Sequence, residues 1–269
     1  MSPNVSTTDP AANLAVLHLS AVTLSVIIPA FNEAATIEAV LDGVWRTGVA
    51  HQIILVDDGG TDQTGPIASR WAERTGRPVI VVTHRRNLGK GRAIRSGLEF
   101  VTGSHVVIQD ADLECDPTDL IRLLAVLNHD APVVYGSRYL GGSFKRTSWT
   151  WNRLGVSLLN AMLWSLYGRS LSDEAACYKL LPTPLLKSLD LRCRRFEFCP
   201  EVTAKLCRLN WPIVEVPVKY HPRSAAEGKK LQIGDGFVAI LSLLRWRISP
   251  LPPAALRRQV FNQPLSGQS

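Results

Sequence analysis

Apolar runs alternate with amphipathic segments along the first half of the chain. Residues 22–29 (VTLSVIIP) form an apolar, β-branched run that is typical of a buried parallel strand. Segment 33–45 then carries apolar residues at helical spacing, and Asn32 is a candidate cap for this helix. Continued along the chain, the pattern predicts strands at 52–56, 78–83, 105–109 and 133–135, and helices at 63–74, 93–101 and 117–127.

This alternation predicts an open α/β sheet, mainly parallel, with right-handed crossovers. Ligands of such sheets bind at the carboxyl ends of the strands. Acidic residues follow three of the predicted strands at that edge: Glu33, Asp57, Asp58, Asp110, Asp112 and Glu114. One acidic loop would be ordinary, but several strand ends with acids on one edge indicate a binding site.

The segment DADLE is the strongest candidate for a metal site. Its acids Asp110, Asp112 and Glu114 alternate, and in an extended chain alternate side chains lie on one side. Carboxylates placed together repel one another unless a cation joins them, and Mg²⁺ or Mn²⁺ prefers oxygen ligands and leaves positions open for substrate phosphates. The alternative is a turn that caps the next helix, for which Asp116 before Pro117 is another candidate.

A basic segment with two glycines, HRRNLGKGR at 84–92, precedes a predicted helix. Backbone N–H groups and cations in such a segment can hold phosphates. It matches neither a Walker A motif nor a dinucleotide-binding fingerprint. Taken alone, an ordinary solvated turn explains it as well.

Composition favours one large folded domain. The chain has 269 residues, 46% of them hydrophobic, which excludes global disorder. Five cysteines without a CxxC pair predict neither a zinc site nor a disulfide framework, so reduced thiols in a cytoplasmic protein are expected. The expected organisation is a leader at 1–21, a domain at 22–247 with halves at 22–145 and 146–247, and a basic tail at 248–269.

The net charge of +7 is concentrated near the C-terminus, where residues 219–269 hold eight Lys or Arg and two acids. This asymmetry suggests an anionic partner such as a lipid headgroup, a phosphate or a nucleic acid. No nucleic-acid motif supports the last of these. Residues 1–20 lack a secretion signal and no apolar run reaches about 18 residues, so a soluble or peripheral protein is expected.

Two further segments, 149–167 and 237–246, are apolar at helical spacing. The first contains Trp149, Trp151 and Trp164, and Arg245 and Arg247 lie at the end of the second. Tryptophans and basic residues are typical of helices at a membrane surface. Packing on the core or in a dimer interface is the alternative, and an oligomer is left open.

Five motifs occur in order over residues 22–145: VIIPAFNE, ILVDDGGTDQT, NLGKGRAIRSGL, QDADLECDP and VYGSRYLGGS. Together they resemble the family 2 inverting glycosyltransferases of the GT-A fold. The later segments SDEAACYK, FEFCPEVTAKL, VEVPVKYHPRSAAEGKK and IGDGFVAI resemble the polyprenol-phosphate (dolichol-phosphate-type) sugar transferases. The resemblance covers about 22–247 and implies a Rossmann-like, mainly parallel mixed sheet flanked by helices, with amphipathic helices near the C-terminus.

The resemblance also implies roles for the matching residues, with Glu33 toward the ribose and the aspartate pair toward base and ribose. The implied donor-binding residues are Pro29, Ala30, Asn32, Glu33, Asp57, Asp58, Lys90 and Asp110. The implied ligands of Mg²⁺ or Mn²⁺ are Asp110, Asp112 and Glu114, and the implied acceptor-phosphate residues are Arg138, Arg223 and Lys230. Relatives often carry Gln at the position of Glu114 and Ser at the position of Gly60. Lys229 stands where lipid-phosphate members tend to show Ser, which leaves the acceptor class open.

The implied activity is transfer of a hexose, mannose or glucose, from a GDP- or UDP-sugar to a polyprenyl phosphate at the cytoplasmic face of a membrane. Catalysis is assigned to Asp112, Asp173 and Arg138. A phosphate nucleophile is already anionic, whereas a hydroxyl acceptor requires a base. Asp173 is then the first candidate and Glu174 the second, although a helix or turn cap explains Asp173 almost as well.

Two other functions are left open. The first is a family 2 transferase that acts on a glycan or small-molecule hydroxyl in cell-envelope polysaccharide synthesis. The second is a non-catalytic module that binds a nucleotide sugar or a membrane, which the intact set of acids disfavours.

Overall fold

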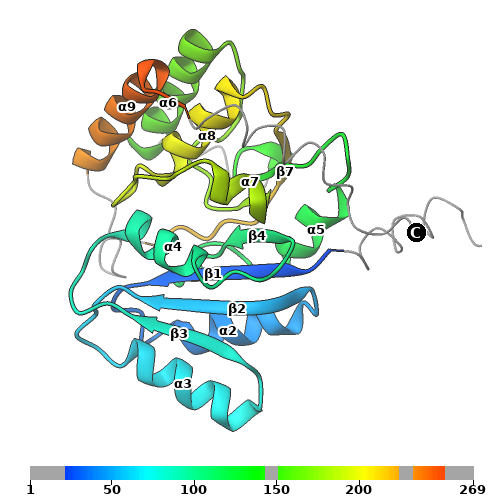
Figure 1. Ribbon diagram of the computed structural model, residues 1–269, viewed down its shortest axis with the longest axis vertical. Helices are drawn as coiled ribbons and strands as arrows, with labels where there is room; N and C mark the ends of the chain where they lie inside the picture. The colour runs from blue at the N-terminus through cyan, green and yellow to red at the C-terminus, as the bar shows by residue number, and fades with distance from the viewer. Residues whose placement is uncertain (1–21, 143–150, 224–232, 252–269) are drawn as a thin grey trace, which may run out of the picture.

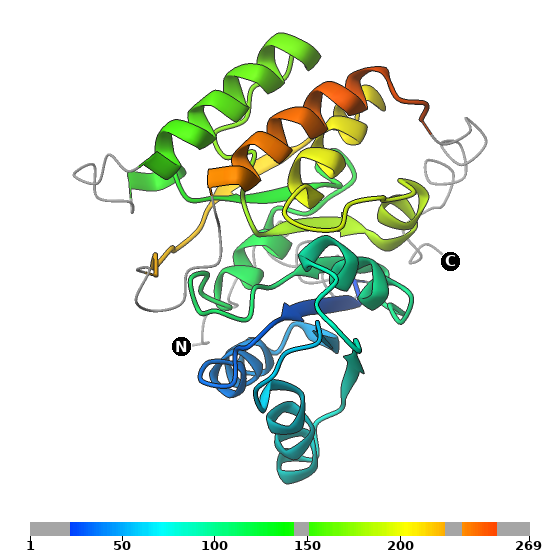
Figure 2. The same ribbon diagram turned by 90° about the vertical axis from the view of Figure 1, so that its left-hand side faces the viewer.

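The computed structural model describes residues 22–142, 151–223 and 233–251 (Figure 1). The expected leader, most of the expected tail, Trp149 and Lys230 lie outside these residues. Within the described ranges the chain forms a central sheet with helices on both faces, seen from two directions in Figures 1 and 2.

The sheet has seven strands in the order β3-β2-β1-β4-β6-β5-β7. Their bounds are β1 Leu24–Ala30, β2 Ala50–Asp57, β3 Val79–Thr83, β4 His105–Ile108, β5 Val134–Ser137, β6 Lys179–Pro182 and β7 Val214–Pro217. Strand β6 runs antiparallel to β4 and β5, and all other pairs are parallel. The expected mainly parallel mixed sheet is confirmed, whereas β6 and β7 were not predicted.

Helices cover both faces of this sheet. Their bounds are α2 Ile37–Arg46, α3 Thr64–Thr75, α4 Lys90–Leu98, α5 Asp119–Ala125, α6 Trp151–Tyr167, α7 Thr183–Ser188, α8 Phe198–Arg208 and α9 Ile233–Ile248, with a 3-10 turn η1 at Leu140–Gly142. One core joins the sheet to α2, α3 and α5, and the other joins it to α4 and α6 to α9.

Strand β1 shows why the sequence reads as continuous apolar runs. Val26 and Ile28 belong to the core under α2 and α3, while Ile27 between them belongs to the core under α4. Both faces of the strand are therefore covered, and no polar position alternates with the apolar ones. Each such side chain contributes roughly 1.5–3 kcal/mol through burial.

The expected cap at Asn32 is wrong. Helix α2 begins at Ile37 with Thr36 as its N-cap residue, four residues later than predicted. Asn32 has φ +53°, and its Oδ1 accepts a hydrogen bond of 2.8 Å from the Thr61 N–H. An asparagine tolerates this left-handed conformation better than most residues, so the same side chain that suggested a cap stabilises a turn between two loops.

Helices α6 and α9 lie side by side (Figures 1 and 2), and the Tyr167 hydroxyl donates to the Leu243 carbonyl oxygen at 2.6 Å. Their large exposed apolar side chains are Leu154, Leu158 and Trp164 on α6 and Phe237, Val238, Leu241, Leu244 and Ile248 on α9. The amphipathic character expected for the C-terminal helices is not confirmed, because their outward faces carry many apolar residues. None of the described helices has the length and apolarity to cross a bilayer.

His105 opens β4 and is 3% exposed. Burial lowers the pKa of His105 to about 4 from an ordinary value of 6.5. The unfolded chain therefore binds the extra proton first as the pH falls, and stability rises with pH between these values. We expect the free energy of unfolding to drop by about 2.5 kcal/mol more in the wild type than in His105→Gln between pH 7 and pH 4.5. Urea unfolding at the two pH values measures this, and equal pH dependence in both proteins would contradict it.

Candidate functional site

The candidate residues come together at one edge of the sheet. Strands β1, β2 and β4 are parallel neighbours, so their carboxyl ends meet there. Strand β5 runs the same way, and β6 begins at this edge because it is antiparallel to both of its neighbours. The segments after β5 and β7 and the segment before β6 therefore join the acidic loops that follow β1, β2 and β4.

The aspartate pair after β2 holds two loops in place. Asp57 accepts hydrogen bonds from the backbone N–H groups of Gly60 and Gly65 at 3.1 and 3.2 Å. Asp58 accepts from the N–H groups of Leu88 and Gly89 at 3.0 and 2.7 Å. Asp58 also contacts the His84 ring at 2.7 Å. Both carboxylates are buried and shape the loops at this edge of the sheet, and their contact with base and ribose stays a prediction.

Several backbone N–H groups of the expected phosphate-binding segment 84–92 are already paired in this structure. The N–H groups of Gly91 and Arg92 donate to the carbonyl oxygens of Arg195 and Arg194, both at 2.9 Å. Gly89 has φ +96°, and a Cβ there would clash with the Arg194 carbonyl oxygen. The main chain of 194–195 therefore caps helix α4, and the Lys90 side chain reaches Asp110.

Lys90 forms an ion pair of 2.5 Å with Asp110, the first acid of the DADLE segment. Burial works against the charged ammonium, yet the Asp110 carboxylate raises the pKa of Lys90 overall. The pKa of Asp110 is lowered despite its own burial, because Lys90 and the Cys177 thiol stabilise the carboxylate. Lys90 and Asp110 thus remain charged and paired at the end of β4.

The DADLE segment is not extended, although Asp110 and Glu114 remain close enough to raise the pKa of Asp112. Leu113 has φ +61°, and the Glu114 N–H donates to Asp112 Oδ1 at 3.0 Å, so the segment turns. Glu114 accepts hydrogen bonds of 2.8 Å from the Tyr220 hydroxyl and the Arg223 N–H. Within the described part of the chain, no group of three or more His, Cys, Asp or Glu residues could hold a metal ion. The extended conformation expected for this segment is wrong, whereas the assignment of Asp110, Asp112 and Glu114 as metal ligands stays a prediction.

Asp112 nevertheless has the chemistry of a metal ligand. Burial and the neighbouring carboxylates of Asp110 and Glu114 raise the pKa of Asp112 to about 6. An Arg223 guanidinium nitrogen lies 3.2 Å from its Oδ2. A hard divalent cation uses one or two protein carboxylates and completes its shell with water and substrate phosphates. Asp112 fits such a cation together with a donor diphosphate, and no third carboxylate is needed.

Arg138, directly after β5, forms a bidentate ion pair with Asp173, which precedes β6. Arg138 Nε and Nη2 each lie 2.7 Å from the carboxylate of Asp173, and the Arg138 N–H donates to it at 3.0 Å. The Asp173 side chain is 0% exposed, while Arg138 lies over the ring of Tyr220 at 5.1 Å from its centroid. The structure thus joins two residues predicted separately, and Asp173 would have to leave Arg138 to act as a base.

Glu174, the second candidate base, is buried beside the same pair. Neither of its carboxylate oxygens has a hydrogen-bond partner within ordinary distance. Burial is the main cause that raises the pKa of Glu174, which favours the neutral acid. The Lys179 ammonium donates to the Glu174 carbonyl oxygen at 2.8 Å and lies 3.8 Å from the Tyr135 ring centroid. These buried neighbours give Glu174 no path to an acceptor hydroxyl at the edge.

Two residues of the site were missed by sequence reasoning. Glu215 on β7 accepts hydrogen bonds from the Ser172 and Asp173 N–H groups at 2.7 and 3.0 Å, and from the Ser172 hydroxyl at 2.9 Å. Tyr220 contacts both Glu114 and Arg138. Glu215 therefore positions the segment that carries Asp173. Both contacts depend on the pairing of β7 with β5, which no local pattern signalled.

The remaining predicted residues have simple placements. Pro29 and Ala30 end β1, and the Asn32 side chain accepts a hydrogen bond from the Thr61 N–H. Glu33 pairs with Arg223 at 2.9 Å. Lys230 is outside the described residues.

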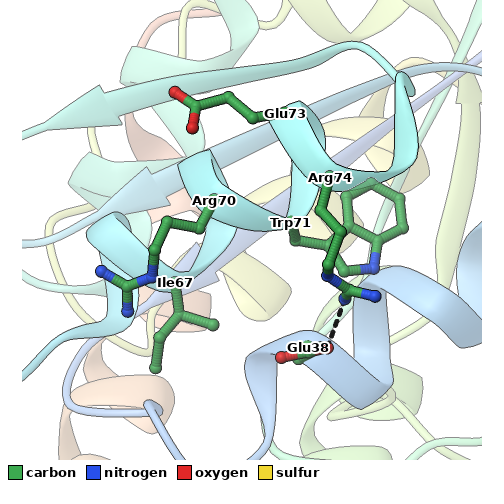
Figure 3. Close-up of a pocket in the computed structure, with 6 residues that line it drawn as sticks. All are labelled: Glu38, Ile67, Arg70, Trp71, Glu73 and Arg74. Atoms are coloured by element: carbon green, nitrogen blue, oxygen red, sulfur yellow. Dashed lines mark hydrogen bonds and ion pairs between the residues drawn. The ribbon is translucent and has the colours of Figure 1, made fainter.

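A shallow hollow of about 590 Å³ lies elsewhere, on the outer surface of α2 and α3 (Figure 3). It is lined by Glu38, Ile67, Arg70, Trp71, Glu73 and Arg74. Its walls include the ion pair of 2.5 Å between Arg74 and Glu38 that Figure 3 marks. The hollow contains none of the candidate residues, so the sheet edge remains the site.

This chain is similar in sequence to enzymes that are named for polyprenyl-phosphate sugars. A polyprenol monophosphomannose synthase of Mycolicibacterium smegmatis is 29% identical over 211 residues, 76% of this chain and 79% of that protein. An undecaprenyl-phosphate 4-deoxy-4-formamido-L-arabinose transferase of Edwardsiella ictaluri is 28% identical over 239 residues, 87% of this chain and 69% of that protein.

Among solved structures, the glucosyl-3-phosphoglycerate synthase of Mycobacterium tuberculosis, in complex with Mn²⁺, uridine diphosphate and phosphoglyceric acid, superposes with a TM-score of 0.67. The two share 21% identity over 93% of this chain and 85% of that one, a likeness that shows the fold. The family described as glycosyl transferase family 2 matches residues 25–188. With this match, the ordered motifs and the GT-A architecture, the chain belongs to glycosyl transferase family 2.

Proposed function

We propose that this glycosyltransferase moves a sugar from a nucleotide-sugar donor to a polyprenyl phosphate, with inversion at the anomeric carbon. The observation that carries the proposal is that acidic and basic side chains lie next to each other at one edge of the sheet. Acids Asp110 and Asp112 lie on the donor side, and arginines Arg138 and Arg223 lie beside them on the acceptor side. Relatives with 28–29% identity are named for transfer to or synthesis of polyprenyl-phosphate sugars.

On the donor side, Asp112 would hold Mg²⁺ or Mn²⁺ together with the diphosphate of a GDP- or UDP-sugar. The bound metal supplies charge neutralisation for the departing nucleotide diphosphate. Lys90, paired with Asp110, adds a cation at the same edge. Asp57 and Asp58 keep the surrounding loops in the shape that receives the nucleotide.

On the acceptor side, the state of Asp173 favours a phosphate over a hydroxyl. A hydroxyl acceptor needs a base, but the Asp173 carboxylate is buried and takes three hydrogen bonds from Arg138. A phosphate monoester arrives as an anion and requires positive charge instead. Arg138 and Arg223 provide that charge, and the ion pair holds Arg138 in a fixed orientation.

The proposal is tested by incubating the full chain with Mn²⁺, a panel of GDP- and UDP-sugars and a short polyprenyl phosphate. Mass spectrometry of the lipid fraction is expected to find a lipid-linked sugar and to identify its donor. Transfer only to an added hydroxyl acceptor would move the assignment to glycan synthesis. Nucleotide binding without any turnover would favour a binding module.

We further propose that α6 and α9 bring the enzyme to an anionic membrane as a peripheral protein, at the cytoplasmic face where nucleotide sugars are present. Large exposed apolar side chains on both helices are joined by exposed Arg245 and Arg247 at the end of α9. Apolar burial together with basic residues is how interfacial helices bind lipid. Peripheral contact would place the edge of the sheet within reach of a lipid phosphate.

A double variant in which both Phe237 and Leu241 are replaced by serine is expected to bind vesicles that contain anionic lipid more weakly, by roughly 10-fold or more. The reason is that apolar burial in the lipid is lost at both positions. Cosedimentation with such vesicles measures the effect. Ile121→Ser is the matched control, since Ile121 is also exposed but lies on α5 on the other face of the sheet. Equal losses in both variants would mean that α9 is not the membrane face.

A further inference from the structure

Arg223 covers two carboxylates of the donor side at once. Its two terminal nitrogens bind the Glu33 carboxylate at 3.1 and 2.9 Å. One of them also lies 3.2 Å from Asp112 Oδ2. The guanidinium therefore places a positive charge on the carboxylate that fits a divalent cation.

The main chain of Arg223 is held separately from its side chain. The Arg223 N–H donates to Glu114 at 2.8 Å, and the His221 N–H donates to the Glu114 carbonyl oxygen at 2.8 Å. Tyr220 adds a hydroxyl contact to the same carboxylate and an antiparallel bridge to Cys115. Because Glu114 fixes the backbone, the long arginine side chain can change its partner while the segment stays in place.

The guanidinium is also incompletely satisfied where it lies. Arg223 Nε is buried and has no hydrogen-bond partner. A buried donor without a partner costs about 1–3 kcal/mol, which makes the pose easier to leave. The side chain is thus held only through its two terminal nitrogens, while Nε is left unpaired.

We propose that Arg223 is an internal counter-ion of the donor site, which competes with the divalent metal for Asp112. A guanidinium and a divalent cation repel each other at contact distance, so they compete for the Asp112 carboxylate. With a divalent cation on Asp112, the guanidinium would leave both Asp112 and Glu33, and the Glu33 carboxylate would keep its hydrogen bond from the Thr36 hydroxyl. The released guanidinium then turns to the phosphates at the same edge, so that the donor complex forms before the acceptor is held.

This inference rests on the metal position in the proposed function, and it makes a separate prediction about metal alone. Free Mn²⁺ should bind the wild type weakly, since binding must displace Arg223. Removing the charge in Arg223→Met should raise the affinity for Mn²⁺ by about 10-fold or more, the usual scale of a charge-assisted contact. No donor, acceptor or turnover enters this measurement.

The experiment titrates the full chain with Mn²⁺ in the absence of nucleotide and follows free Mn²⁺ by electron paramagnetic resonance. Lys219→Met is the matched control, because Lys219 lies on the same segment but pairs with Asp116. It should keep the wild-type affinity, and Arg223→Lys should fall between the wild type and Arg223→Met. Thermal melting of each variant verifies folding.

An affinity that is equal in the wild type and Arg223→Met, or undetectable in both, would overturn the inference. Tighter Mn²⁺ binding in Lys219→Met by the same factor would also overturn it, because general loss of positive charge would then explain the gain. The outcome of the lipid-product assay does not depend on the outcome of the Mn²⁺ titration. A gain in Mn²⁺ affinity without a lipid-linked sugar keeps the counter-ion role and rejects the acceptor.

Discussion

Asp112→Asn is expected to lower kcat for sugar transfer by about 10³-fold or more, since a metal at the leaving group is worth several kcal/mol. The substitution keeps the size of the side chain and the acceptor for the Glu114 N–H, but removes the charge that fits a cation. Product formation with the donor found by mass spectrometry measures the loss, and added metal should not restore it.

Asp116→Asn is the control for this variant. Asp116 lies four residues further along and pairs with Lys219 and the Thr118 N–H, outside the donor contacts. Its replacement should leave kcat within a few-fold of the wild type. Similar losses for both aspartates would indicate that the turn as a whole, and no particular carboxylate, supports activity.

The second large effect concerns the buried ion pair of Arg138 and Asp173. Arg138→Met leaves an Asp173 carboxylate with 0% exposure and no neutralising partner, which is expected to cost about 3–5 kcal/mol of unfolding free energy. Asp173→Asn should cost a comparable amount, and the double variant should cost clearly less than the sum. Urea unfolding of the four proteins completes the double-mutant cycle.

Arg192 and Asp190 provide the comparison, since their ion pair of 3.1 Å is 63% and 65% exposed. Solvent screens such a pair, so Arg192→Met should cost less than about 1 kcal/mol. Activity gives a second readout. Asp173→Asn keeps the Arg138 charge and should retain part of the acceptor binding that Arg138→Met loses. Additive effects in the cycle would show that the two residues do not act as a pair.

The parts of the fold that could be predicted are those with a local signal. Strands β1, β2 and β4 are buried on both faces, and their apolar runs stand out between helical segments. The acidic residues at their ends meet at one edge of the sheet, as the alternation predicted. Strands β6 and β7 have four residues each, and β6 reverses direction, so neither periodicity nor alternation revealed them.

The predictions that failed at the site failed for two reasons, which are local backbone conformation and contacts between residues far apart in the chain. The spacing of Asp112 and Glu114 suggested that their side chains lie on one side of an extended segment. The positive φ of Leu113 turns the segment instead, and a leucine gives no sequence signal for such a conformation. Glu33 and Arg223 are 190 residues apart in the chain and meet only through the order of the strands. Their pairing could be known only from the folded molecule.

The cap on helix α4 has a consequence for how the chain tolerates change. Carbonyl oxygens of residues 194 and 195 accept the N–H groups of Arg92 and Gly91 in its first turn, while both arginine side chains remain exposed. Substitution at either position leaves the acceptors where they are, because every amino acid carries the same carbonyl. Insertion or deletion of one residue would shift both acceptors and release the helix that begins with Lys90. We therefore expect this stretch to tolerate changes of residue type but not changes of length.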